Sequence, residues 1–314
     1  MSKTDDDAAR SRRLGAAMVL AAAAGFATMP TFTKLAYESG ADTIGVLAAR
    51  LVIAAALVLG GVRLTQGRLR LGRPPLQVAL LVALFSGQAY CFFASVDENT
   101  AVRAVLLLYA YPLITTLAAA VLFGEELGAR KLALLLVGFA GVALSVGTLS
   151  ASFTLLGLLL GIGSAVLFSA FMLTAKGTLN RHGNPVEMMG LVYAGAAVVY
   201  CVVALTRGAS LPGDGGGWAA FAGVALIGTV GAMSLFFAGL DRLPAGVAAM
   251  LSTLEPALSV LFAAAVLGES LAPRQIVGVL LVVGSIYALG RMIAAREAEP
   301  SLPTPEPTTT PTAR

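Results

Sequence analysis

Two charged side chains stand inside long apolar stretches of this sequence, Glu255 within residues 244–267 and Arg50 within residues 43–62. A charge in the apolar interior of a membrane protein is costly and by default marks the path of a substrate or an ion. At 1.5 Å per residue, Glu255 lies roughly 15 Å and Arg50 roughly 10 Å into a helix, so the two reach similar depths. We expect Glu255 to bind a proton or a substrate amine, or to act as a structural acid that Arg50 neutralises. Arg50 would pair with Glu255 or with a substrate carboxylate.

Further candidates are aromatic or polar side chains in other apolar segments. Tyr109 and Tyr111 flank the start of a proline-containing stretch, and a tyrosine in an apolar interior usually needs a hydrogen-bond partner. Pro256 lacks an N–H, which frees the carbonyl of Ser252 and favours a kink. Pro112 is a second candidate for a structural role. The alternative role for Tyr109 and Tyr111 is helix packing. The alternative for Lys34 is that its side chain simply extends toward the membrane surface. The proposed cavity residues are Tyr109, Tyr111, Gln88, Tyr90 and Lys34.

The chain has no pattern typical of an enzyme. The only histidine, His182, stands in a polar loop, and no HExxH, GxSxG or Walker motif is present. Cys91 and Cys201 lie in apolar stretches without metal-ligand spacing. We therefore expect no catalytic residue, no metal and no cofactor.

Composition places the chain in a membrane. Of its 314 residues 58% are hydrophobic and 12% are charged, whereas a soluble domain carries roughly 25% charged residues. The basic residues flank apolar segments and form no single patch, which argues against a nucleic-acid partner.

A bilayer-spanning helix needs about 20 mostly apolar residues. Polar tails at 1–13 and 297–314 flank the apolar part, and the second is rich in proline and threonine and is predicted to be disordered. The segments predicted to span are 14–37, 43–62, 76–96, 101–123, 131–148, 155–179, 186–206, 218–240, 244–267 and 274–293.

Most of the 21 lysines and arginines fall at one side of such a bundle. The positive-inside rule then places both termini and the loop at 124–131 in the cytoplasm, with 268–273 outside. We expect a multi-pass protein of the cell membrane.

An internal repeat divides the apolar part in two. A shift of 144 places residues 101–130 on 245–274 without a gap and aligns the ordered set Pro…Gly-Glu-x-Leu…Arg. Each unit holds five spans, an odd number, so the second unit must enter the membrane from the opposite side. The predicted fold is all-α, with ten transmembrane helices as two inverted five-helix repeats. Glu125 and Glu269, each five residues before an arginine, are expected to fix a structural turn.

These motifs resemble the EamA-type branch of the drug/metabolite transporter superfamily. The resemblance rests on YPLITTLAAAVLFGEEL at 111–127, EPALSVLFAAAVLGESL at 255–271, Gly25-Phe26 and Arg50. It covers 14–293 and implies repeats at 14–148 and 154–293 and transport of a small molecule. The first copy departs from the second by carrying Tyr111 where the second has Glu255.

The leading interpretation is a secondary transporter, an exporter of a small polar metabolite such as an amino acid. One buried acid and one buried base suit an amphoteric substrate, and protons are a candidate coupling ion. The nearest alternative is an exporter of drugs or organic cations, since an acid among aromatic rings suits a cation. A membrane-embedded lipid-processing enzyme or a scaffold is the alternative from another class. The expected partners are the substrate and membrane lipid; the sequence leaves monomer and dimer open.

Overall fold

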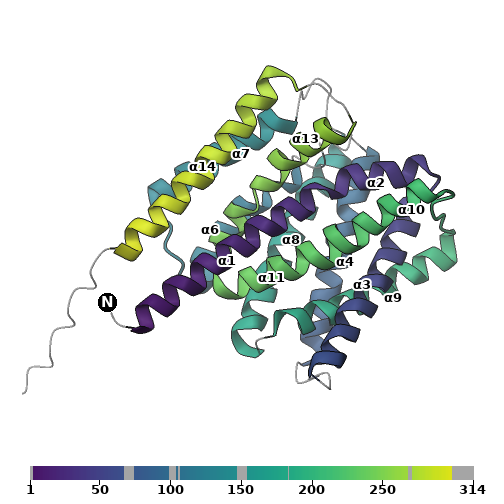
Figure 1. Cartoon of the computed structure of the whole chain (residues 1–314), viewed down its shortest axis with the longest axis horizontal. Helices are drawn as coiled ribbons and strands as arrows, with labels where there is room; N and C mark the ends of the chain where they lie inside the picture. The colour runs from purple at the N-terminus through teal and green to yellow at the C-terminus, as the bar shows by residue number, and fades with distance from the viewer. Residues whose placement is uncertain are drawn as a thin grey trace, which may run out of the picture.

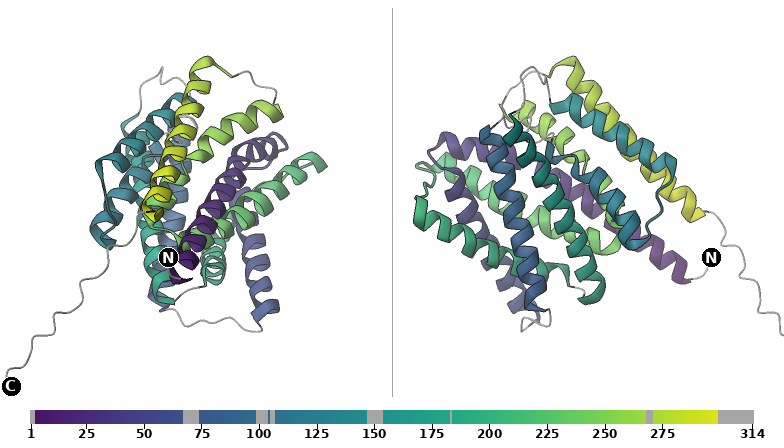
Figure 2. Two further views of the ribbon diagram at one scale, coloured as in Figure 1. Left: turned by 60° about the vertical axis from the view of Figure 1, so that its left-hand side comes forward. Right: turned by 180° about the vertical axis from the view of Figure 1, so that it is seen from behind.

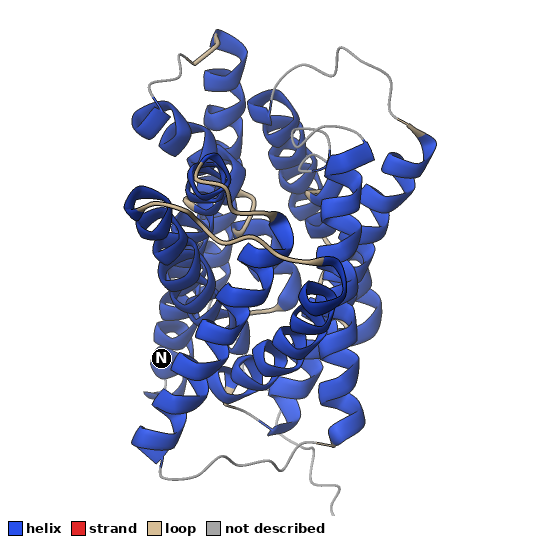
Figure 3. Ribbon diagram, turned by 90° about the vertical axis from the view of Figure 1, so that its right-hand side faces the viewer, coloured by secondary structure: helices blue, strands red, loops and turns tan. Residues whose placement is uncertain are grey.

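A computed structural model of the chain describes residues 3–66, 74–98, 104, 107–146, 154–182, 184–267 and 271–298. Its described part is built from helices and the turns between them, without a strand (Figure 3). The helices of the first half are α1 (Lys3–Ala27), α2 (Met29–Glu38), α3 (Thr43–Gln66), α4 (Pro75–Glu98), α6 (Tyr111–Phe123) and α7 (Ala129–Val146). Those of the second half are α8 (Leu155–His182), α9 (Pro185–Arg207), α10 (Gly215–Ala222), the π-helix η1 (Gly223–Gly231), α11 (Ala232–Arg242), α12 (Ala245–Leu251), α13 (Leu254–Leu267) and α14 (Pro273–Ala298).

Apolar length identifies a membrane protein. Eight helical stretches of the described chain are long and apolar enough to cross a bilayer, and the apolar helix α6 is shorter. Large apolar side chains such as Leu64, Val121 and Leu205 are more than four-fifths exposed, which is stable only where that surface meets lipid. Each predicted segment overlaps a described helix, although 101–103, 105–106, 147–148 and the loop residues 268–270 lie outside the described residues.

The two halves interlock throughout the bundle (Figures 1 and 2). The most extensive contacts between the halves pair α1 with α11, α4 with α8, α3 with α9, α6 with α12 and α7 with α14. Exchanging the repeats turns the α1–α11 pair into the α8–α4 pair and leaves the α3–α9 and α7–α14 pairs unchanged. These pairings are compatible with a two-fold relation between the repeats. The start of α1 and the end of α14 lie at the same end of the bundle (Figures 1 and 2).

Three spans are broken near their middle, each next to a proline. The first span breaks at Thr28, before Pro30, and α12 gives way to α13 at Ser252–Thr253, before Pro256. Tyr109 and Ala110 form the corresponding turn before α6, whose first turn holds Pro112. Proline cannot donate the helical hydrogen bond and clashes with the preceding turn, so breaks at these positions follow from the sequence.

Candidate functional site

The broken spans of the two repeats meet at a pair of tyrosines and an acid. Tyr109 and Tyr111 are 5% and 3% exposed, and their ring centroids are 6.0 Å apart. The Tyr109 hydroxyl donates a hydrogen bond to the Glu255 carboxyl, and the Tyr111 side chain hydrogen-bonds Ser252. Sequence reasoning named Tyr109, Tyr111 and Glu255 and overlooked the Ser252 hydroxyl. The structure brings these four side chains together across the repeat interface.

The break beside Glu255 is satisfied locally. Pro256 has no N–H to donate to the carbonyl of Ser252, and that carbonyl instead accepts from the N–H of Glu255 at 3.1 Å. The Ser252 hydroxyl lies 2.9 Å from the Ala248 carbonyl. The carbonyl that we expected the proline to leave free is thus used inside the turn, and the polarity of the site comes from side chains.

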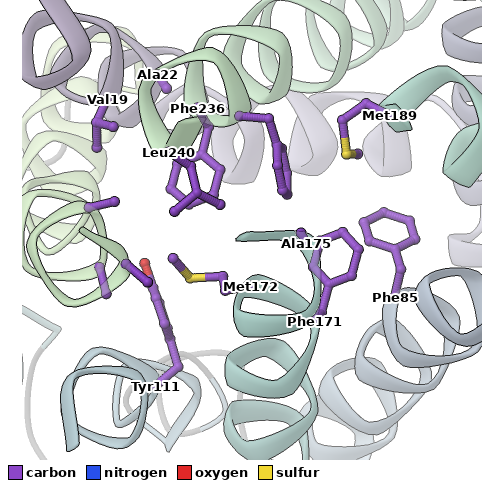
Figure 4. Close-up of a cluster of buried hydrophobic side chains, with 14 of the residues drawn as sticks. Val19, Ala22, Phe85, Tyr111, Phe171, Met172, Ala175, Met189, Phe236 and Leu240 are labelled. Carbon is purple, nitrogen blue, oxygen red and sulfur yellow. The ribbon is translucent and has the colours of Figure 1, made fainter. Parts of the chain in front are cut away.

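Aromatic rings from α8 form one wall of the site. The ring of Phe168 meets Tyr111 edge to face at 4.7 Å, and the Ser169 hydroxyl donates to the Tyr111 carbonyl at 3.2 Å. Phe168 continues to Phe171, which contacts both Phe85 and Phe237. Figure 4 shows Tyr111, Phe171 and Phe85 reaching into one interior, opposite Phe236 and Leu240. The acid of this site therefore stands beside a largely apolar, aromatic surface.

Arg50 lies in the interior on α3, near tyrosines of neighbouring helices. Tyr193 and Tyr200 of α9 and Tyr37 of α2 interact with it electrostatically. The two α9 phenols donate elsewhere, Tyr193 to the Thr229 carbonyl of η1 at 2.9 Å and Tyr200 to the Ser86 carbonyl at 3.2 Å. Because each of these two phenols donates its proton to a carbonyl, its oxygen can take part in a further hydrogen bond only as an acceptor. The Nε of Arg50 is buried and has no hydrogen-bond partner among the described residues.

The predicted ion pair between Arg50 and Glu255 is not formed in the described chain. The partner of Glu255 is the Tyr109 hydroxyl, and Arg50 has tyrosines as its charged or ionisable neighbours. Both side chains nevertheless keep partial exposure, while Tyr109 and Ser252 beside Glu255 are buried. The acid and the base thus occupy separate environments in the described chain.

The remaining predicted cavity residues lie outside this cluster. Tyr90 is 63% exposed and follows Leu80 and Ala83 at helical spacing on an exposed stripe of α4. Lys34 is exposed on α2, and Gln88 is partly exposed, one turn from the buried Phe85. Tyr90 therefore belongs to the outer surface of the bundle, because the helix period places it with lipid-facing residues.

Glu125 binds the start of a helix in the other repeat. Gly124 ends α6 with a φ of 65°, a left-handed conformation that suits glycine. The chain then turns so that the two Glu125 carboxylate oxygens accept from the N–H groups of Ala245 at 2.6 Å and Gly246 at 3.1 Å. The carboxylate therefore caps α12, at the end where the helix dipole favours an anion.

Glu125 also forms an ion pair, with a lysine of α7. Its partner is Lys131, at 3.7 Å, and Arg130 instead lines a groove between α7 and α14. The predicted structural role thus extends beyond a local turn to the second repeat. Glu269, the other acid of this motif, lies outside the described residues.

Lys176 binds the end of α11, the helix that precedes the turn into α12. Its Nζ donates to the carbonyls of Leu240 at 2.8 Å and Asp241 at 3.1 Å, at the end of α11. A cation is favourable where a helix ends. Sequence reasoning counted Lys176 only toward orientation, because nothing in its local pattern indicates which helix end lies opposite. The α11–α12 turn is therefore fixed by an anion at one helix end and a cation at the other.

Comparison with known proteins agrees with this architecture. A crystal structure described only as that of a protein superposes with a TM-score of 0.78 at 20% identity, covering 91% of this chain and 99% of the other. That likeness concerns the fold. No curated protein matches the sequence. The EamA-like transporter family matches twice, at residues 13–147 and 155–291. These two matches take in nearly all of the helical part, and the chain is a multi-pass membrane protein that belongs to the EamA-like transporter family.

Proposed function

We propose that this protein is a secondary transporter that exports a small amphoteric metabolite, with an amino acid as the type of substrate. The observation that carries the proposal is the separation of acid and base in the interior. Glu255 has a neutral partner, Tyr109, and the Nε of Arg50 lacks a hydrogen-bond partner among the described groups. A substrate with an ammonium and a carboxylate group would supply the missing counter-charge to each.

Burial makes this arrangement selective. A buried charge without a partner is strongly destabilising, so an interior Arg50 favours the binding of an anion. A guanidinium can hold a carboxylate through two parallel hydrogen bonds, which fixes orientation as well as charge. Glu255 would then receive the ammonium group, with the rings of Tyr111 and Phe168 against the carbon skeleton of the substrate.

We infer that ten spans in two inverted repeats carry the substrate by alternating access. The interlocked pairing of helices supports a two-fold relation, and the breaks at Tyr109–Ala110 and Ser252–Thr253 lie where the repeats meet. Binding sites at repeat interfaces, next to interrupted helices, are characteristic of such transporters. With both termini in the cytoplasm, the Glu125 cap on α12 would lie at the cytoplasmic end and hold that side closed.

Proton coupling would run through Glu255. In this scheme the carboxyl exchanges a proton for the substrate ammonium as the site changes sides. Glu255→Gln keeps the shape and the hydrogen bonding of the side chain but cannot exchange the proton. Its loss of coupling, with retained substrate exchange, would assign that role to Glu255.

An exporter of organic cations is the second candidate. It is favoured by the position of the acid beside Tyr109, Tyr111 and the Phe168 ring, since aromatic faces attract cations. In that case Arg50 would be structural and would have no contact with the substrate.

The deciding experiment is uptake into proteoliposomes, with amino acids and cationic dyes compared, with and without a pH gradient. Arg50→Gln should abolish amino-acid transport, and Arg63→Gln, an exposed arginine on the same helix, is the matched control. Dye transport that survives Arg50→Gln, with no amino-acid transport in the unmodified protein, would favour the cation exporter. Absence of transport for every substrate, by protein that is folded and inserted, would refute both.

A further inference from the structure

An open groove runs between the start of α7 and the end of α14, at the edge of the molecule and away from the central site. Its volume is about 890 Å³. The two helices lie side by side along one flank of the bundle (Figures 1 and 2). Residues lining the groove are Glu126, Gly128, Ala129, Arg130, Lys131, Ala133, Leu134, Val137, Ala288, Arg291 and Met292.

Charge in the groove is mainly positive. Arg130 and Arg291 are exposed, and neither has an ion pair among the described residues. Lys131 is already engaged with the Glu125 carboxylate and the Glu126 carbonyl. Glu126 contributes one negative charge to the lining. Two arginines remain for a ligand, and guanidinium groups bind phosphate in bidentate geometry.

Below the charges the walls are apolar. Leu134 and Val137 of α7 and Ala288 of α14 continue the groove toward the middle of the membrane, and Met292 lines it beside Arg291. Val137 is 41% exposed and lies seven residues beyond Arg130, roughly 10 Å further along the helix. Tyr287, one turn from Arg291, is 67% exposed, as is common for tyrosines at the headgroup level. The groove thus changes from cationic to apolar over the depth at which a phospholipid changes from headgroup to acyl chain.

We propose that this groove binds an anionic phospholipid, with its phosphate between Arg130 and Arg291 and the start of an acyl chain against Leu134 and Val137. Basic pockets between transmembrane helices on the cytoplasmic side are suited to anionic headgroups. A lipid seated there bridges α7 and α14, the pair that packs most closely at the flank. This inference is independent of the transported substrate, because no groove residue belongs to the central site.

The test is native mass spectrometry of the purified, delipidated full-length protein titrated with dioleoylphosphatidylglycerol or dioleoylphosphatidylcholine. The first molecule of dioleoylphosphatidylglycerol should bind at least tenfold more tightly than the first molecule of dioleoylphosphatidylcholine. Each of Arg130→Gln and Arg291→Gln should weaken that step about fivefold, and the double variant about 25-fold, since one basic residue near an anionic headgroup contributes about 1 kcal/mol. Arg63→Gln, an exposed arginine near the end of α3, is the control and should change nothing.

A second variant tests the shape of the groove. Ala288→Trp fills the apolar part without changing charge and should weaken binding of both lipids. Equal binding of the two lipids to the unmodified protein, or full binding to the double arginine variant, would overturn the proposal. So would an equal loss in Arg63→Gln, which would indicate general surface attraction. Displacement by inorganic phosphate or sn-glycerol 3-phosphate at similar concentrations would show a site for soluble phosphate compounds and would refute the lipid.

Discussion

Removing the Glu125 carboxylate should loosen the contact between the two repeats. The carboxylate accepts two backbone N–H groups of α12 and lies 3.7 Å from Lys131, with 12% of its side chain and 9% of the Lys131 side chain exposed. Hydrogen bonds to a charged group contribute about 1.5–3 kcal/mol each. Breaking a buried ion pair costs about 3–5 kcal/mol. Both energies describe the same carboxylate, so they are not added. We expect Glu125→Ala to lower the free energy of unfolding by about 4 kcal/mol.

The assay is reversible unfolding of the purified protein in detergent, followed by its helical circular dichroism signal. Glu126→Ala is the matched control, because it removes an exposed acid one residue further along and should cost less than about 1 kcal/mol. Lys131→Met removes the cation while the carboxylate keeps its two N–H partners. The double variant Glu125→Ala with Lys131→Met should therefore be more stable than the sum of the single changes predicts, by about 2 kcal/mol.

A loss below about 1 kcal/mol in Glu125→Ala would refute the cap, since two bonds to a carboxylate at these distances cannot then be present. Additive single changes would refute the ion pair and leave the cap. Glu125→Gln separates the two contributions further, because an amide keeps one acceptor oxygen and turns a donor toward the second N–H. Its cost should lie between those of Glu125→Ala and the unmodified protein.

Three further predictions concern other parts of the bundle. Tyr109→Phe removes the hydrogen bond to Glu255 and should raise the KM for a transported substrate about tenfold while the protein stays folded, as thermal unfolding can confirm; an unchanged KM would place the pair outside the site. Asp42→Ala removes the acceptor of the Gly45 and Ser210 N–H groups, at 2.6 and 2.9 Å, and should lower stability by about 1 kcal/mol, whereas unchanged stability would deny the cap at the start of α3. Gly278→Val would place its Cβ about 2.5 Å from the Ser145 amide and should separate α7 from α14, at a cost of at least about 1–3 kcal/mol; normal expression and stability would contradict that close approach.

The sequence predicted the class of the fold from few physical signals. Apolar length and the clustering of charge indicated the spanning segments, and the repeated Pro…Gly-Glu pattern indicated two units, in agreement with the two family matches. Pro256 indicated the break before α13, since the missing N–H is a local property, whereas the breaks beside Pro30 and Pro112 were not predicted. The π-helix η1 was not predicted, because its extra residue per turn is stabilised by contacts such as Tyr193 to Thr229 from another helix.

Partners across the bundle were the least predictable part of the site. Depth alone suggested that Arg50 and Glu255 could meet, yet depth fixes only one of three coordinates, and the two face different neighbours. Tyr90, which is exposed on α4, presents a related difficulty, since a polar aromatic residue in a span is equally compatible with the cavity and the lipid face. Tyr111 lies near Glu255, as the repeat alignment indicated, and its part in a substrate site stays a prediction.

The departure between the repeats gives the central site its polarity. An exact repeat would place an acid at both 111 and 255, and two carboxylates sharing one buried site repel each other, so one would have to stay protonated. With Tyr111 at one of these positions, the site keeps a single acid, which the neighbouring Tyr109 hydroxyl can hydrogen-bond in either protonation state. In the proposed alternating-access scheme the two halves would exchange roles as the site opens to each side, while the single acid would stay on one half. Tyr111→Glu should test this reasoning: it should weaken binding of an amphoteric substrate, and an unchanged affinity would show that the asymmetry is incidental.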